Sequence, residues 1–140
     1  MLEVARILHV LGVILWIGGG LTSALLATSA IARSKDVRDA ILSDVRRALL
    51  FVSAPGLVLA FVAGVAILAS HWDVYRTMGW SHAKLTLGLL LAGVSGALSA
   101  RVRKAATAER EPNAGVFMAL GGALALGALL ALVLVFARPF

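Results

Sequence analysis

Four long stretches of this sequence contain no Asp, Glu, Lys or Arg: 7–32, 48–72, 85–100 and 112–137. Three of them have 25 or 26 residues, and about 20 helical residues are enough to cross the hydrocarbon core of a bilayer. The third reaches this length if it begins near Thr77 and includes Lys84. The pattern therefore predicts an all-α protein, a four-helix transmembrane bundle that forms one membrane domain over residues 1–140. The expected helices are, approximately, 4–32, 48–72, 77–100 and 113–137.

The polar segments between these stretches carry local signals for helix starts and bends. Acidic and basic residues interleave in the first connection, which favours a short surface helix at Val37–Arg47. Pro112 with Asn113 is typical of a helix start. Pro55 lies early in the second helix, where its missing N–H frees a backbone carbonyl, and we expect a bend there.

Composition supports a membrane protein and excludes several other classes. Hydrophobic residues make up 61% of the chain and charged residues 14%, against roughly 25% charged residues in soluble domains. A soluble domain of this size still leaves about 30% of its unfolded surface in water, which excludes a soluble globular protein here. The first apolar stretch is longer than the about 7–15 residues of a secretory signal, so we expect it to remain in the protein. The lack of cysteine excludes disulfides, thiolate metal sites and c-type haem attachment.

The net charge of +6 is placed along the chain in a way that indicates membrane orientation rather than nucleic-acid binding. Nine of the 13 Lys and Arg residues lie in the first and third connections. Because cytoplasmic loops carry such an excess of basic residues, we expect both termini and the 73–80 turn to lie outside. The surplus charge also favours contact with anionic lipid headgroups. The nine residues are Arg33, Lys35, Arg38, Arg46, Arg47, Arg101, Arg103, Lys104 and Arg110.

Small and polar residues form stripes on three of the expected helices, at helical spacing. Such stripes let helix backbones approach closely in membrane bundles. They serve packing within one chain or between chains, so a homo-oligomer is an open alternative. The stripes are His9, Gly12, Trp16, Gly19 and Ser23 on the first helix, Lys84, Gly88, Ala92, Ser95 and Ser99 on the third, and Gly115, Ala119, Gly121 and Ala125 on the fourth.

The candidate chemistry lies with four ionisable residues towards the expected outer side: His9, His71, His82 and Lys84. Neutral imidazoles from facing helices can bind haem iron while small residues make room for the macrocycle, which suggests b-type haem. His9 is the deepest and the best candidate ligand; His71 is expected at the interface, and for His82 both roles are open. Lys84 either extends its ammonium to the interface or pairs with a carboxylate, a haem propionate or a polar redox substrate.

Two motifs resemble the HemJ-type protoporphyrinogen IX oxidases. The segment Arg6-Ile7-Leu8-His9, followed by Trp16 and Gly19, is similar to the first helix of that family. The segment Trp80-Ser81-His82-Ala83-Lys84-Leu85 is similar to the family's Trp-x-His-x-Lys-Leu start of the third helix. The resemblance covers nearly the whole chain. It also includes Arg46 and Arg47 with Pro55 downstream, and the ending Arg138-Pro139-Phe140.

The resemblance implies an integral protein of the bacterial inner (cytoplasmic) membrane that binds haem b (heme b). It would oxidise protoporphyrinogen IX to protoporphyrin IX in haem biosynthesis and pass the electrons to the respiratory chain through quinone. By the same resemblance, His9 would bind the haem iron, and His82 and Lys84 would contribute to cofactor binding. Lys84, Arg6 and Trp16 would be the catalytic residues.

The sequence also departs from the family pattern, which leaves other functions open. After Gly20 the family's second histidine is missing, its later histidine is replaced around Ser95-Gly96, and the last helix begins without the family's polar residues. One alternative is a haem-binding electron carrier or sensor without oxidase activity. Another is a metal-handling membrane protein akin to the copper-resistance protein D group, although soft Cys and Met ligands are scarce here. A lipid-embedded scaffold with interfacial histidines is the last.

Overall fold

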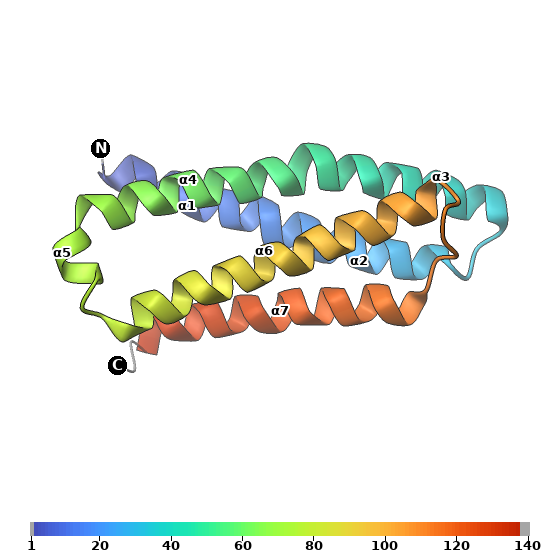
Figure 1. The fold of residues 1–140 in the computed structure, drawn as a ribbon. Coiled ribbons are helices and arrows are strands. Elements are labelled where there is room, and N and C mark those ends of the chain that lie inside the picture. Colours follow the sequence, from blue (N-terminus) through green and yellow to red (C-terminus); the bar gives the residue numbers. More distant parts are fainter. Residues whose placement is uncertain (1, 138–140) are drawn as a thin grey trace.

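The computed structural model describes residues 2–137, in which helices are joined by short turns and loops and there is no strand (Figure 1). It confirms the predicted all-α, four-helix architecture. The ending Arg138-Pro139-Phe140, which contributed to the family resemblance, lies outside the described residues. The elements are α1 (Leu2–Val13), η1 (Ile14–Gly18), α2 (Gly19–Ala30), α3 (Lys35–Ala48), η2 (Leu49–Ser53), α4 (Ala54–Ser70), α5 (Trp72–Tyr75), α6 (Gly79–Ala106) and α7 (Ala114–Ala137), where η marks π-helix.

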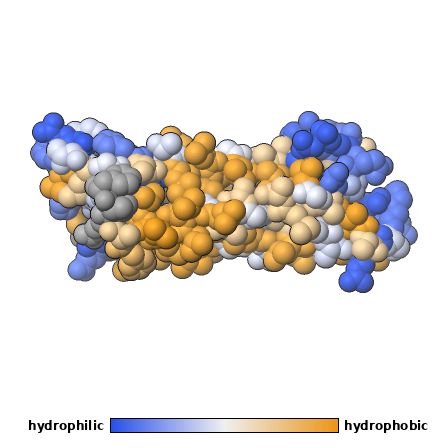
Figure 2. All heavy atoms as spheres, turned by 90° about the horizontal axis from the view of Figure 1, so that it is seen from below, coloured by the Kyte–Doolittle hydropathy of each residue, from blue (hydrophilic) through white to orange (hydrophobic). Residues whose placement is uncertain are grey.

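Several of these elements join into four continuous helices that are long and apolar enough to cross a membrane: Leu2–Ala30, Lys35–Ser70, Gly79–Ala106 and Ala114–Ala137. At 1.5 Å per residue even the shortest spans about 36 Å. Figure 2 shows hydrophilic residues gathered at the two ends of the molecule and a hydrophobic surface between them. The chain therefore has the architecture of a multi-pass membrane protein.

The basic connections lie at one end of the bundle, with α3, and the N-terminus lies with α5 at the other end (Figure 1). We call residues 17–53 and 95–124 the α3 half, and residues 2–13, 57–94 and 125–137 the α5 half. This arrangement agrees with the segregation of charge in the sequence.

Helix boundaries differ from the expected ones mainly in the α3 half. The first connection does not hold a separate surface helix, because α3 runs without a break into η2 and α4. Leu42 and Val45 of α3 are buried and pack towards α2 and α6, and this contact extends the second helix beyond the charge-free stretch. The third helix likewise continues to Ala106. The last helix begins as expected, because the Asn113 side-chain oxygen accepts a hydrogen bond from the Val116 N–H at 3.1 Å.

The first and second long helices touch through glycine. A Cβ on Gly56 would lie 2.6 Å from the Trp16 backbone nitrogen and 2.9 Å from the Gly12 carbonyl oxygen. A Cβ on Gly12 would collide with the backbone of Gly56 and Ala60. Only glycine at these two positions allows the backbones to come this close, as the stripe on the first helix predicted.

Two π-helical segments, η1 and η2, lie next to this contact. Pro55 follows η2 and has no N–H to donate to the preceding turn, and the wider i→i+5 turn is one way for a helix to absorb such a residue. Where the sequence predicted a bend at Pro55, the structure has the π-helical segment Leu49–Ser53 two residues before it. The Ser53 hydroxyl of η2 donates to the Trp16 carbonyl of η1 at 2.9 Å, which joins the two segments.

Large buried side chains are concentrated in the α3 half. In the described α5 half, Leu91 is the one large hydrophobic residue that is buried. There α1 packs on α4 and α6 on α7, while the backbones of the two pairs do not approach each other closely (Figure 1). The largest fully buried residues are Phe117, Leu42, Leu98, Leu124, Val45 and Val102.

The packing face of α7 differs from the expected one. Of the four predicted positions only Gly121 is buried, whereas Gly115, Ala119 and Ala125 are exposed. This helix is apolar on every side, so its sequence has no polar face that would mark the side turned to lipid. The buried positions are Phe117, Gly121, Leu124 and Gly127.

Candidate functional site

His9 of α1 is held in one orientation by α4. Its Nδ1 lies 2.7 Å from the carbonyl oxygen of Ala60. A carbonyl oxygen only accepts hydrogen bonds, so Nδ1 carries the proton and donates. In the neutral ring Nε2 is then the unprotonated nitrogen.

Gly64 makes room for this arrangement. A Cβ at Gly64 would lie 3.2 Å from both Nδ1 and Cε1 of the His9 ring, which is tighter than an ordinary van der Waals contact. The ring therefore sits against the backbone of α4 at the one position of that turn where no side chain intervenes.

This geometry has a specific chemical capacity. Histidines that bind metals usually donate their other ring N–H to a carbonyl or carboxylate, which fixes the tautomer and the ring direction. His9 has that second partner already, and its Nε2 lone pair is left for a Lewis acid such as haem iron. The same bond also joins α1 to α4, so it contributes to packing whether or not a metal binds.

The other two histidines do not join His9. His82 is exposed, and its Nε2 donates to the Arg76 carbonyl oxygen at 3.0 Å, which closes the turn before α6. His71 is exposed, lies 3.0 Å from the Ser70 hydroxyl through Nδ1 and contacts the Tyr75 ring edge-on. Within residues 2–137 no group of three or more His, Asp or Glu residues could hold a metal ion, so His9 is a single candidate ligand.

Lys84 lies on α6 in the α5 half and is partly buried. It has no hydrogen bond or ion pair with another residue of the described chain. A partly buried ammonium without a carboxylate partner is costly in an apolar setting. Its charge is therefore available to an anionic group that enters from outside the chain.

Trp16 lies at the centre of the bundle. It is 5% exposed, and its indole N–H donates to the Ser95 hydroxyl of α6 at 2.7 Å. Its ring packs against Phe61 with the centroids 6.2 Å apart. Trp16 thus connects the first helix to α4 and α6, and its one polar atom is already bonded.

Arg6 is exposed on α1. Ten residues separate it from Trp16, which corresponds to about 15 Å along a helix. Lys84 and Ser95, the partner of Trp16, are about 16 Å apart on α6 by the same rise. The three residues with expected catalytic roles therefore lie at different levels of the bundle, with Arg6 and Lys84 nearer the α5 end.

A haem group is compatible with the α5 half in some respects. The two helix pairs are loosely joined there, and both His9 and Lys84 belong to it. His9 has a tautomer that would let Nε2 hold haem iron, and neither of the other described histidines lies with it. Two cavities of the structure lie elsewhere: Arg101 and Phe117 are among the residues that line one, and Arg46 and Arg103 are among those that line the other.

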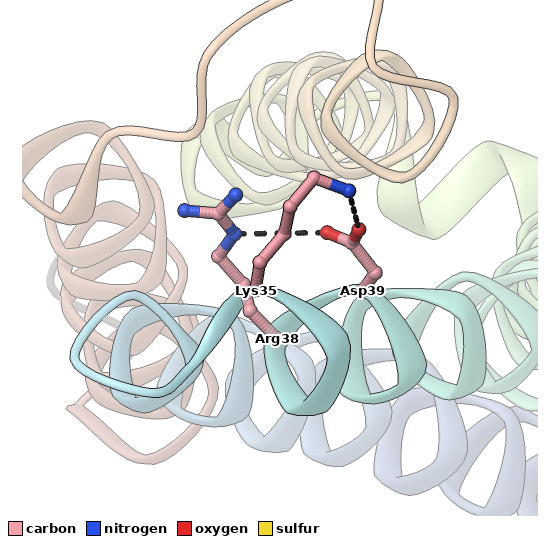
Figure 3. A network of polar contacts seen from close by, with 3 residues as sticks. All are labelled: Lys35, Arg38 and Asp39. Carbon is pink, nitrogen blue, oxygen red and sulfur yellow. Dashed lines mark hydrogen bonds and ion pairs between the residues drawn. The ribbon is translucent and has the colours of Figure 1, made fainter.

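A charged network at the start of α3 does not contribute to this site (Figure 3). Lys35 Nζ donates to Asp39 Oδ2 at 2.9 Å, and Arg38 Nε lies 3.6 Å from Asp39 Oδ1. The second distance is too long for a hydrogen bond, so the buried Nε of Arg38 has no hydrogen-bond partner among the described residues. The exposed pair of Lys35 and Asp39 contributes little to stability.

Sequence reasoning missed three participants in these contacts. Ala60 supports His9 through a backbone carbonyl, which every residue has, and Gly64 through its missing side chain, which the sequence shows without showing that His9 faces it. Ser53 supports Trp16 from a segment whose π-helical shape no periodicity predicts. Ser95 did lie on the expected stripe of the third helix, and that stripe was the available signal.

Comparison with known proteins gives no relative: the chain matches no family model, no curated protein and no solved structure.

Proposed function

We propose that this protein binds haem b in the bacterial inner membrane and oxidises protoporphyrinogen IX, as the resemblance to the HemJ-type oxidases suggests. The observation that carries the proposal is the hydrogen bond from His9 Nδ1 to the Ala60 carbonyl oxygen at 2.7 Å. It leaves Nε2 as the free lone pair that an axial ligand needs.

In this proposal the α3 end faces the cytoplasm and the termini face outwards. The support is the concentration of Lys and Arg in the connections of the α3 end, which is the usual arrangement for cytoplasmic loops. His9 and Lys84 then lie in the half of the bundle nearer the outer surface.

The chain's own residues would divide the work as follows. His9 would bind the haem iron through Nε2, held in place by Ala60. The ammonium of Lys84 would pair with a propionate of the haem or of the tetrapyrrole substrate. Bound haem supplies a one-electron acceptor; the electrons and protons removed from protoporphyrinogen would finally reduce quinone to quinol.

A haem-binding electron carrier or sensor is the second candidate. It is favoured by the separation of Arg6, Trp16 and Lys84 along the bundle and by the saturated indole N–H of Trp16. A carrier needs His9 and a haem pocket but no catalytic group beside the substrate.

The test combines spectroscopy with complementation. Protein purified in detergent and loaded with haem should show a Soret band, which His9→Ala should abolish. His71→Ala, an exposed histidine, is the matched control and should leave the band unchanged. Growth of a bacterial strain that lacks its protoporphyrinogen oxidase should be restored by the unaltered chain and lost with Lys84→Ala.

The outcomes separate the candidates. Haem loading without growth would support the carrier or sensor and contradict the oxidase. A colourless protein that binds copper would support the metal-handling alternative, and a Soret band that persists in His9→Ala would show that another residue binds the iron.

A further inference from the structure

An open groove of about 460 Å³ lies between the second long helix and α6 in the α3 half. Its volume is within the roughly 300–1,000 Å³ usual for ligand sites. The groove is remote from His9 and Lys84, so the proposed function does not use it. Its lining residues are Arg46, Leu49, Leu50, Ser99, Ala100 and Arg103.

Two guanidinium groups from different helices line this one groove. Arg46 and Arg103 form no ion pair with any described residue, whereas the neighbouring Arg47 pairs with Asp44 at 3.6 Å. Like charges placed near each other repel. An anion that accepts hydrogen bonds from both groups would remove that repulsion, and phosphate suits the planar guanidinium well.

The rest of the groove is apolar. Leu49 is buried and Leu50 is 53% exposed, and Phe51 continues the apolar surface beyond Leu50 with 76% exposure. A water-soluble anion would not bury this apolar surface. An amphiphile would cover the surface with its acyl chain.

The charge pattern of the two helices places the groove at the depth expected for lipid headgroups. The charge-free stretches of the two helices begin at residue 48 and end at residue 100, so Arg46 and Arg103 stand just beyond the hydrocarbon on both helices. Leu49, Leu50 and Ala100 stand just within it. The change from basic to apolar residues therefore falls at the same level on both helices.

We propose that this groove binds one anionic phospholipid, with its phosphate between Arg46 and Arg103 and an acyl chain along Leu50. Ser99 lines the same groove one helical turn below Arg103. The recognised chemistry is a phosphodiester joined to an acyl chain, and both parts are required.

The experiment uses native mass spectrometry of the full chain released from detergent with phosphatidylglycerol added. The unaltered protein should retain one lipid. Since each basic residue near the surface typically contributes a factor of several, Arg46→Gln with Arg103→Gln should weaken retention about 30-fold. Arg33→Gln with Arg47→Gln removes the same charge from the same end outside the groove and should change retention less than about twofold.

A second variant tests the groove without altering charge. Ser99→Phe should fill the space and cause a similar loss of lipid, while far-UV circular dichroism confirms that the helices remain. Equal losses in the two charge variants would overturn the proposal, because general surface attraction would then explain binding. Displacement of the lipid by inorganic phosphate alone would show a simple anion site, and displacement by mesoporphyrin would show a tetrapyrrole site; either result contradicts the assignment to lipid.

Discussion

The two halves of the bundle differ in how they are held together. In the α3 half, large side chains such as Leu42, Leu98 and Phe117 fill the space between three or four helices. In the α5 half, two helix pairs lie apart, and Leu91 is the one large buried hydrophobic residue among those described there. Yet His9 and Lys84, the strongest candidates for a chemical role, belong to the loosely packed half.

The difference indicates a division between scaffold and site. Regions with few buried contacts open at low free-energy cost and are used for ligand binding. The α3 half can fix the relative position of the helices, and the α5 half is where the proposed cofactor would enter without loss of the fold. The comparison is open to test by substitutions matched across the two halves.

The largest effect is expected from one residue type at the two ends of α7. Phe117 is 2% exposed in the α3 half and Phe136 is 82% exposed in the α5 half. Phe117→Ala should lower the free energy of unfolding by about 3–5 kcal/mol because it opens a cavity. Phe136→Ala should change it by less than about 0.5 kcal/mol. Unfolding in mixed micelles, followed by circular dichroism, measures both, and equal losses would contradict the division.

A smaller effect on stability is expected at the contact between the first two long helices. Its control should change stability in the opposite direction. Gly56→Ala should destabilise the protein by about 1–3 kcal/mol, since its Cβ meets backbone atoms that cannot yield. Gly88 has no neighbour within 4 Å of its Cβ position, so Gly88→Ala should stabilise α6 by about 0.5–1 kcal/mol. Stabilisation in both variants would show that the helices do not touch at Gly56.

The smallest effect concerns the bond that ties the first helix to α6 where the two halves meet. A double-mutant cycle of Trp16→Phe and Ser95→Ala should give a coupling free energy of about 0.5–1.5 kcal/mol. The same unfolding assay measures it. A coupling near zero would mean that the 2.7 Å hydrogen bond does not hold the pairs together.

Most of the fold could be predicted from the sequence. The charge-free stretches locate four membrane-spanning helices because hydrocarbon excludes charge, and Asn113 marks a helix start because its side chain caps the helix. The continuity of α3 with α4 was missed. It depends on Leu42 and Val45 reaching the core, which a count of charges does not reveal.

The candidate site was less predictable. The stripe through His9, Gly12 and Trp16 correctly indicated the inward side of the first helix, since polar and small residues stand out in an apolar span. The support that His9 receives from the Ala60 carbonyl could not be predicted, because every residue has that group and only the packing of two helices selects one. For the same reason only one hydrogen-bond partner of Trp16 was indicated by the sequence: Ser95 lay on the predicted stripe of the third helix, whereas Ser53 was missed.

The π-helical segment η1 makes the position of His9 depend on residues that it never touches. An α-helix turns about 100° per residue, and η1 interrupts that count between α1 and α2. If the residues of Ile14–Gly18 took regular α-helical geometry instead, Leu2–Val13 would be rotated against the rest of the chain. The imidazole would then leave the Ala60 carbonyl although neither residue had changed. The direction of the candidate ligand therefore depends on the geometry of one helical turn as well as on the presence of a histidine.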